Sequence, residues 1–199
     1  MKSLKENAYD IIRLYINQLG IMIFSLLLYF AIDPFGDEAL AKSLNIFISV
    51  FSVCFYLVLI YYVIWDIGAK DKIRIDGGRM ERSKNKGLVM GLIANIPNFL
   101  LGFLTVLFLL IFMATNNDGV YTAFLIFQMI TRFNAAMYLG FIIEIVPPIA
   151  PTGNISYMEF LIESILFMVL PIISPLVTHF AYRMGEQDKK IFAIRKNKQ

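Results

Sequence analysis

The sequence predicts an all-α fold: a polytopic transmembrane helix bundle with four spanning helices and one further helical element that is broken or re-entrant. Of its 199 residues, 58% are hydrophobic and 17% are charged, against about 45–50% and about 25% in soluble domains. The mean hydropathy is +0.68. A small soluble domain could not bury this much apolar surface. Strict alternation of the β-barrel kind is absent, so the segments that cross the bilayer are helices.

Four runs without a charged residue define the spanning helices. They comprise residues 14–32, 43–65, 87–117 and 164–182, which are 19, 23, 31 and 19 residues long. A helix needs about 20 residues to cross the hydrocarbon core. We therefore expect one membrane domain over residues 1–199, with spanning helices at about 11–32, 43–66, 88–114 and 159–184. A basic cytoplasmic loop is expected over 67–87, and a basic cytoplasmic tail over 185–199.

The fifth element covers about residues 120–147 and is interrupted by Arg132. If Tyr121–Pro147 dips in from outside and returns, both termini are cytoplasmic, with 16 basic residues inside and one outside. Five simple transmembrane helices would instead place ten inside and seven outside. The positive-inside rule favours the first arrangement. An equal count results if residues 120–147 span and 159–184 re-enter from the cytoplasm, so both versions stay open, as does the five-helix alternative.

The third apolar run carries a polar stripe. Its members recur every three or four residues and therefore share one helix face: Gly91, Asn95, Asn98, Gly102 and Thr105. Small and amide side chains allow close helix contact and interhelical hydrogen bonds, so a packing seam is the simplest interpretation. Asn95 and Asn98 could alternatively line a polar pathway. Pro97 lies beside them and predicts a kink.

A second polar group interrupts the fifth element, with Gln128, Arg132 and Asn134 close together in sequence. An arginine within the membrane is costly and normally has a partner. Its candidate counter-ions are Glu144 and Glu163. Twelve residues of straight helix would separate Arg132 from Glu144 by about 18 Å, so that pair requires a hairpin. We take these residues, with Asn95 and Asn98, as a candidate ligand or ion pathway.

The central loop is rich in basic residues, and its Asp76-Gly77-Gly78 predicts a turn. Lys70, Lys72, Arg74 and Arg79 could bind anionic lipid or a partner protein. The stretch WDIGAKDKIRIDGGR, residues 65–79, resembles a signature of small multi-pass membrane proteins of low-GC Gram-positive bacteria whose activity is uncharacterised. The resemblance implies a bacterial cytoplasmic membrane location. It transfers no activity and no catalytic residues.

The sequence contains no H-E-x-x-H, G-x-S-x-G or P-loop motif, and only one Cys and one His. We therefore expect no catalytic residues, metal site or cofactor, and we do not favour an enzyme. The leading hypothesis is a small transporter, channel or permease subunit with its polar centre at Arg132. The alternative is a membrane scaffold, immunity or assembly protein. Expected partners are anionic lipids and a second copy or another subunit, but not nucleic acid.

Overall fold

The computed structural model describes residues 8–32, 38–146 and 157–187, and these residues contain helices but no strand. Four helices among them are long and apolar enough to cross a membrane, and one further pair of helices is bent by 80°. Large apolar side chains cover the outer surface, including Leu27, Phe30 and Leu176. The predicted all-α membrane bundle with a broken fifth element is confirmed.

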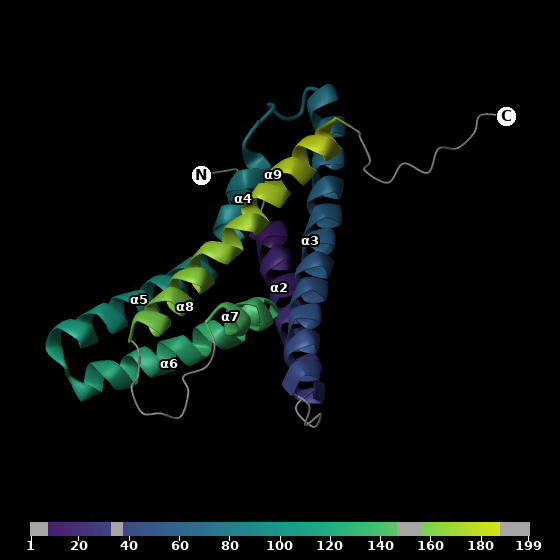
Figure 1. The fold of residues 1–199 in the computed structure, drawn as a ribbon. Coiled ribbons are helices and arrows are strands. Elements are labelled where there is room, and N and C mark those ends of the chain that lie inside the picture. The colour runs from purple at the N-terminus through teal and green to yellow at the C-terminus, as the bar shows by residue number, and fades with distance from the viewer. Residues whose placement is uncertain (1–7, 33–37, 147–156, 188–199) are drawn as a thin grey trace.

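Helices α2 (Ala8–Ile32) and α3 (Glu38–Asp76) form an antiparallel pair (Figure 1). At 1.5 Å per residue, the 39 residues of α3 extend about 58 Å. Helix α9 (Ile173–Glu186) packs along α3, and α4 (Lys86–Ala94) packs on α9. The start of α4 and the end of α9 therefore lie at the same end of the molecule as the end of α3.

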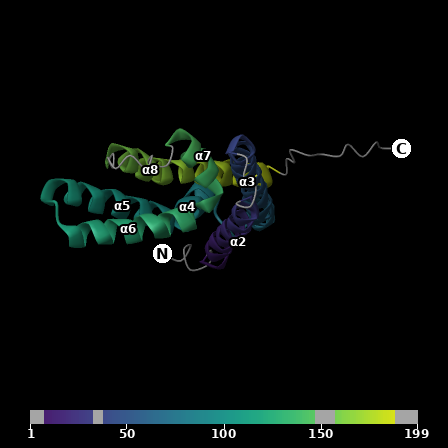
Figure 2. The ribbon, with the colours of Figure 1, turned by 60° about the horizontal axis from the view of Figure 1, so that its bottom comes forward.

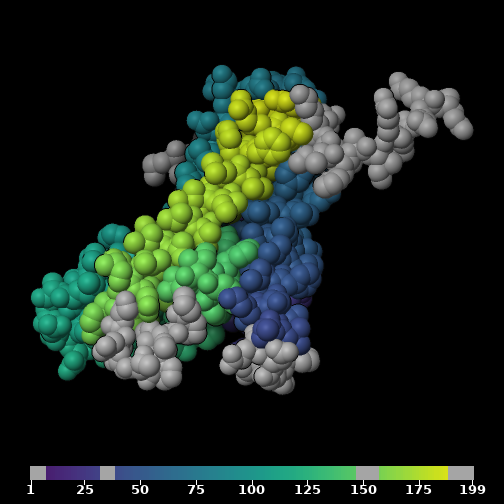
Figure 3. Space-filling view, in the orientation of Figure 1, coloured from purple at the N-terminus to yellow at the C-terminus, as the bar shows by residue number. Residues whose placement is uncertain are grey.

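A second group of helices is inclined to the α2–α3 pair, as Figures 1 and 2 show. It contains α5 (Ile96–Thr115), α6 (Asp118–Asn134) and α8 (Tyr157–Val169). Helix α5 packs against both α6 and α8. In the space-filling view of Figure 3, α8 and α9 cross one face of the molecule diagonally, beside α3.

The reversal between α5 and α6 follows from two asparagines. Asn116 ends α5 in the left-handed conformation, with a φ of 48°, and its N–H donates to the Phe112 carbonyl at 2.8 Å. Asparagine tolerates this conformation better than most residues. Asn117 then caps α6, because its Oδ1 accepts hydrogen bonds from the backbone N–H groups of Gly119 and Val120. Two adjacent side chains thus end one helix and begin the next.

The fifth element is broken after Asn134. A short 3₁₀ turn, η1 (Ala136–Tyr138), joins α6 to α7 (Leu139–Ile145), and the chain changes direction by 80° there. Helix α7 then packs on α3. A Cβ at Gly140 would overlap the Asn45 carbonyl oxygen, so only glycine permits this approach of the two backbones. Residue 147, the end predicted for this element, lies outside the described residues.

The prediction that the second helix ends at residue 66 is wrong, and the loop predicted at 67–87 is limited to residues 77–85. Helix α3 continues to Asp76 because this segment packs against α9: Ile67 and Asp71 are buried, and a Cβ at Gly68 would overlap the Tyr182 carbonyl oxygen. The predicted turn does end the helix. Gly78 has a φ of +68°, and the N–H of Arg79 donates to the Arg74 carbonyl at 2.9 Å, which is a Schellman cap.

Three other boundaries differ from the predicted ones. The helix expected at 88–114 is divided into α4 and α5 at Asn95, two residues before Pro97. The helix expected at 159–184 contains a 3₁₀ turn, η2 (Leu170–Ile172), between α8 and α9. Both interruptions include or adjoin a proline, which lacks the N–H that a continuous helix requires. The tail expected from residue 185 begins within α9, and residues 188–199 lie outside the described part.

Candidate functional site

Arg132 and Glu163 form a two-contact ion pair between α6 and α8. Arginine Nε lies 2.5 Å from Oε1, and Nη2 lies 2.7 Å from Oε2. Gln128, one turn earlier on α6, donates from Nε2 to the same Oε2 at 3.0 Å. The Glu163 side chain is 8% exposed and that of Arg132 is 46% exposed. The structure thus brings together three predicted site residues and identifies Glu163 as the counter-ion.

Glu144 does not contribute to this group. Its Oε2 lies 2.7 Å from Nζ of Lys42, near the start of α3. The bend after α6 directs α7 toward α3 and away from Arg132. The predicted alternative, in which Glu144 pairs with Arg132, is therefore wrong, and Glu144 instead connects the broken element to α3.

The predicted asparagines lie at the interruption between α4 and α5. Asn95 is buried, and its Nδ2 donates to the Gly91 carbonyl at 2.8 Å and to Ser174 Oγ at 3.2 Å. Asn98 Nδ2 donates to Asn95 Oδ1 at 2.9 Å. Because Ser174 belongs to the first turn of α9, these bonds join the interruption at Asn95 to the one that precedes α9.

Asn98 also connects two further helices. It exchanges hydrogen bonds with Gln18 of α2, at 2.7 and 2.9 Å. Asn134, at the end of α6, donates from Nδ2 to Asn98 Oδ1. Tyr15 OH donates to Asn134 Oδ1 at 3.3 Å. Asn134 is therefore part of an amide network centred on Asn98 and is not a ligand of the Arg132 pair.

The stripe that contains Asn95 and Asn98 is a packing seam along its whole length. A Cβ at Gly91 would overlap Thr178 Oγ1 of α9, and a Cβ at Gly102 would lie 3.1 Å from the Met168 Cβ of α8. Thr105 Oγ1 is 2.9 Å from Thr131 Oγ1 of α6. Interruptions of three helical elements thus meet at one hydrogen-bonded network.

Sequence reasoning did not select Gln18, Ser174, Tyr56 or Tyr15 as site residues. Tyr56 OH lies 3.2 Å from Ser174 Oγ, which extends the network to α3. The sequence does contain a pattern that could have identified Gln18. It lies on the α2 stripe with Leu14, Ile21 and Ser25, and the structure buries all four side chains. A glutamine in such a buried stripe requires a polar partner on another helix.

The end of the molecule formed by α3, α4 and α9 contains a second polar group. Buried Asp71 accepts hydrogen bonds from Lys86 Nζ at 2.6 Å and from Tyr182 OH at 3.0 Å. Nearby, Arg82 Nε lies 2.5 Å from Oε1 of Glu186. These contacts connect α3 to α4 and α9, and they connect the segment after α3 to α9.

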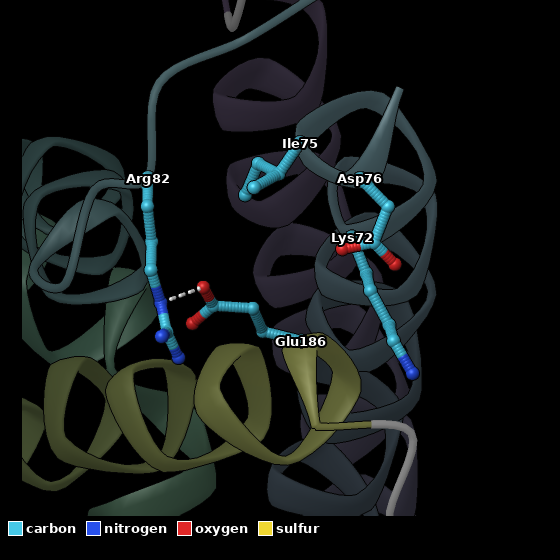
Figure 4. Close-up of a pocket in the computed structure, with 5 residues that line it drawn as sticks. All are labelled: Lys72, Ile75, Asp76, Arg82 and Glu186. Carbon is cyan, nitrogen blue, oxygen red and sulfur yellow. Dashed lines mark ion pairs between the residues drawn. The ribbon is translucent and has the colours of Figure 1, made fainter. Parts of the chain in front are cut away.

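The four predicted basic residues do not converge. Lys70 pairs with Asp66 at 2.5 Å, and Arg74 lies 3.5 Å from Asp71. Arg79 belongs to the Schellman cap through its backbone N–H. Lys72 borders a pocket of about 140 Å³, which is lined by Lys72, Ile75, Asp76, Arg82 and Glu186. In Figure 4 the Glu186 carboxylate points toward Arg82, whereas the Lys72 side chain points away from this pair.

Within the described residues, no group of three or more His, Cys, Asp or Glu side chains could hold a metal ion. No family model, curated protein or solved structure matches the chain.

Proposed function

We propose that the chain is a small membrane transport protein, either a transporter, a channel or a permease subunit, in which Arg132 and Glu163 contact the solute. The half-exposed Arg132 guanidinium is the observation that carries this proposal. Among the described residues, Nε and Nη2 bond to Glu163, while Nη1 has no hydrogen-bond partner. Leu125 and Met129, on the same face of α6, are also exposed.

A guanidinium on an apolar helix face is unfavourable in contact with hydrocarbon. The free energy falls when water, an anion or another polypeptide covers the charge. Because the buried member of the pair is the carboxylate, the accessible member is cationic. The arrangement therefore fits a pathway for anions or for solutes that carry an anionic group.

The bundle is small, so such a pathway would need a wall that another subunit supplies. Helices α6 and α8 present this pair at the surface of a bundle whose described residues contain four candidate spanning helices, or five elements if the bent pair is one span. A second copy, or a different subunit, would complete the wall opposite Arg132. We place the protein in a bacterial cytoplasmic membrane, with both termini cytoplasmic and residues 120–147 re-entrant from outside. The charge distribution along the sequence supports this orientation.

Flux of chloride, phosphate and acetate into proteoliposomes tests the proposal. We expect the wild type to transport at least one of these anions, and we expect the double variant R132Q/E163Q to lose at least about tenfold in rate. The double variant removes both charges, so neither is left unpaired. R82Q is the matched control, because Arg82 also pairs with a buried glutamate, Glu186, at the opposite end of the bundle. Wild-type flux in R132Q/E163Q, or no flux above empty vesicles in the wild type, would contradict the proposal.

The extension of α3 beyond residue 66 favours a second candidate function. In this alternative the chain is a membrane scaffold, immunity or assembly protein that binds a partner or anionic lipid. This extension presents Lys70 and Arg74 one turn apart, and both side chains are exposed. Such a ridge suits anionic headgroups or an acidic partner surface. Neutralising Lys70, Lys72, Arg74 and Arg79 should then abolish partner recovery or association with anionic lipid, while R132Q/E163Q should not change either.

A further inference from the structure

The Arg132–Glu163 pair is electrically neutral and lies in apolar surroundings. Two hydrogen bonds, at 2.5 and 2.7 Å, join one cation to one carboxylate, and Gln128 adds a neutral amide. The neighbouring side chains of Met129 on α6 and Ile162 on α8 are apolar and exposed. A net charge in such surroundings is costly, because few polar groups compensate it. A bound state of this site is therefore favoured when it is neutral as well.

Arg132 can bind an anion while it remains in contact with Glu163. Its Nε and Nη2 bond to the carboxylate, whereas Nη1 has no hydrogen-bond partner among the described residues, and 46% of the side chain is exposed. A guanidinium carries five N–H donors, so donors remain for a second anionic group. The site would then hold one cation and two anions. Without compensation, its net charge would be −1.

The helices around Glu163 supply no second cation. Helix α8 packs against α5, α6 and η2, and neither α5 nor η2 contains an ionisable side chain. On α6 the other ionisable side chains are those of Asp118 and Tyr121. Asp118 is 14 residues from Arg132, or about 21 Å along the helix. The Tyr121 ring packs on Phe112 of α5.

Helix α8 itself adds only acidic or neutral groups. Tyr157 packs edge to face on the Phe112 ring. Glu159 is half-buried and lies one turn before Glu163, so it faces the same side of α8. A second carboxylate at this distance makes additional negative charge still less favourable. A proton is therefore the compensating charge that the site can acquire, and Glu163 is the carboxylate in direct contact with Arg132.

Gln128 can satisfy Glu163 in both protonation states. Its Nε2 donates to Oε2 at 3.0 Å, which favours the ionised carboxylate. The same amide carries a carbonyl oxygen, which accepts a hydrogen bond from a protonated carboxyl group once the amide has turned. Gln128 is 4% exposed, so the exchange takes place away from bulk water. The proton on Glu163 therefore has an acceptor within the protein.

We propose that Glu163 takes up one proton when an anion binds to Arg132, so that the chain carries the anion together with a proton. This proposal rests on the anion pathway proposed above. The proton comes from water on the exposed side of the pair, forms an O–H bond on Glu163 and is released when the anion leaves. The loaded site then holds the guanidinium, the anion and a neutral carboxyl group. Its net charge is zero, as in the empty site, and no other covalent bond changes.

Isothermal titration calorimetry of the full chain in detergent, with sodium chloride and sodium methanesulfonate as probes, tests the proposal. Both are anions of strong acids, so a proton taken up on binding is taken up by the protein. Titrations in buffers of different ionisation enthalpy count that proton, and we expect about one per bound anion. Because the complex holds more protons than the free protein, raising the pH favours the free protein. The affinity should fall by up to about tenfold per pH unit between about pH 5 and pH 8.

The variant E163Q should bind both anions with an affinity that does not change with pH, and it should take up no proton, because glutamine does not ionise. E186Q is the matched control. Glu186 is also a buried carboxylate, and it lies 2.5 Å from Nε of Arg82, but at the opposite end of the bundle. E159Q tests the neighbouring carboxylate. Both E186Q and E159Q should retain the proton uptake.

Anion binding without proton uptake in the wild type, at an affinity independent of pH, would overturn the proposal and leave the anion site at Arg132 intact. Loss of the uptake in E159Q, with retention in E163Q, would overturn it as well. If the wild type binds neither anion, the proposed function itself is contradicted. The proton count in the wild type requires no variant, so it decides the proposal even if E163Q does not fold.

Discussion

Asn95 Nδ2 donates to Ser174 Oγ at 3.2 Å, and this bond joins two interrupted helices, α4–α5 and α8–α9. The helix pairs on either side of it run together, with α4 on α9 and α5 on α8. Asn98, one turn after Asn95, extends the connection to Gln18 and Asn134. The interruptions are therefore fixed relative to one another by hydrogen bonds between side-chain amides and hydroxyls.

The first prediction concerns the asymmetry of the Arg132 pair. R132Q should destabilise the protein more than E163Q, because it leaves a buried carboxylate without its cation, whereas E163Q leaves a guanidinium that is already half exposed. We expect R132Q to cost about 1–3 kcal/mol, below the range for a fully buried pair. The double variant R132Q/E163Q should recover part of this loss. Unfolding in mixed detergent micelles measures all three, and equal costs for the two single variants would contradict the asymmetry.

The second prediction concerns the bond between Gln18 and Asn98. Q18L and N98L should each destabilise the bundle by about 1 kcal/mol or more. N98L leaves the buried Gln18 amide without its partner, and Q18L removes two hydrogen bonds from Asn98, which keeps Asn95 and Asn134 as partners. The double variant Q18L/N98L should cost less than the sum of the two, with a coupling energy of about 0.5–1.5 kcal/mol. A double-mutant cycle measures this coupling. N85L is the control, since Asn85 is exposed and makes no capping bond with its side chain; additive effects for Gln18 and Asn98 would show that the amides do not interact.

The Arg132 pair shows what single-sequence reasoning could reach. An arginine within an apolar segment requires a counter-ion. Few acidic residues lie in or beside such segments, so the candidate counter-ions are Glu144 and Glu163. The choice between them depended on the direction of the bend after Asn134. That direction is set by contacts such as Gly140 against Asn45, which are distant in sequence and leave no local pattern.

The extension of α3 to Asp76, in contrast, could not be predicted from the sequence. The segment after residue 66 contains several charges and reads as a loop, because a buried aspartate is not expected without visible partners. Its partners, Lys86 and Tyr182, come from α4 and α9. The sequence does not single out Gln18 for the same reason, since its partner Asn98 lies 80 residues away. In both cases, contacts between segments that are distant in sequence determine the structure.

The third prediction concerns the close packing of α3 on α9. A Cβ at Gly185 would overlap the Trp65 carbonyl oxygen and would lie 3.0 Å from the Ala69 nitrogen. Because both are backbone atoms, the helices must separate to accept it. G185A should therefore destabilise the bundle by about 1–3 kcal/mol. The control is G20A, since nothing lies within 4 Å of a Cβ at Gly20, and alanine there should stabilise α2 by about 0.5–1 kcal/mol. Similar unfolding midpoints for G185A and wild type would contradict the packing.

The fourth prediction concerns orientation in the membrane. Cysteines introduced singly at Thr152 and Lys196, in a background in which Cys54 is replaced by alanine, should react with impermeant maleimide from opposite sides in oriented vesicles. The expectation follows from the positive-inside rule, because an odd number of crossings between these positions leaves the basic tail on the cytoplasmic side. Reaction of both positions from the cytoplasm would instead make residues 159–184 the re-entrant element. Reaction of Lys196→Cys from outside would mean five simple crossings, with the 80° bend in α6–α7 contained within a spanning segment.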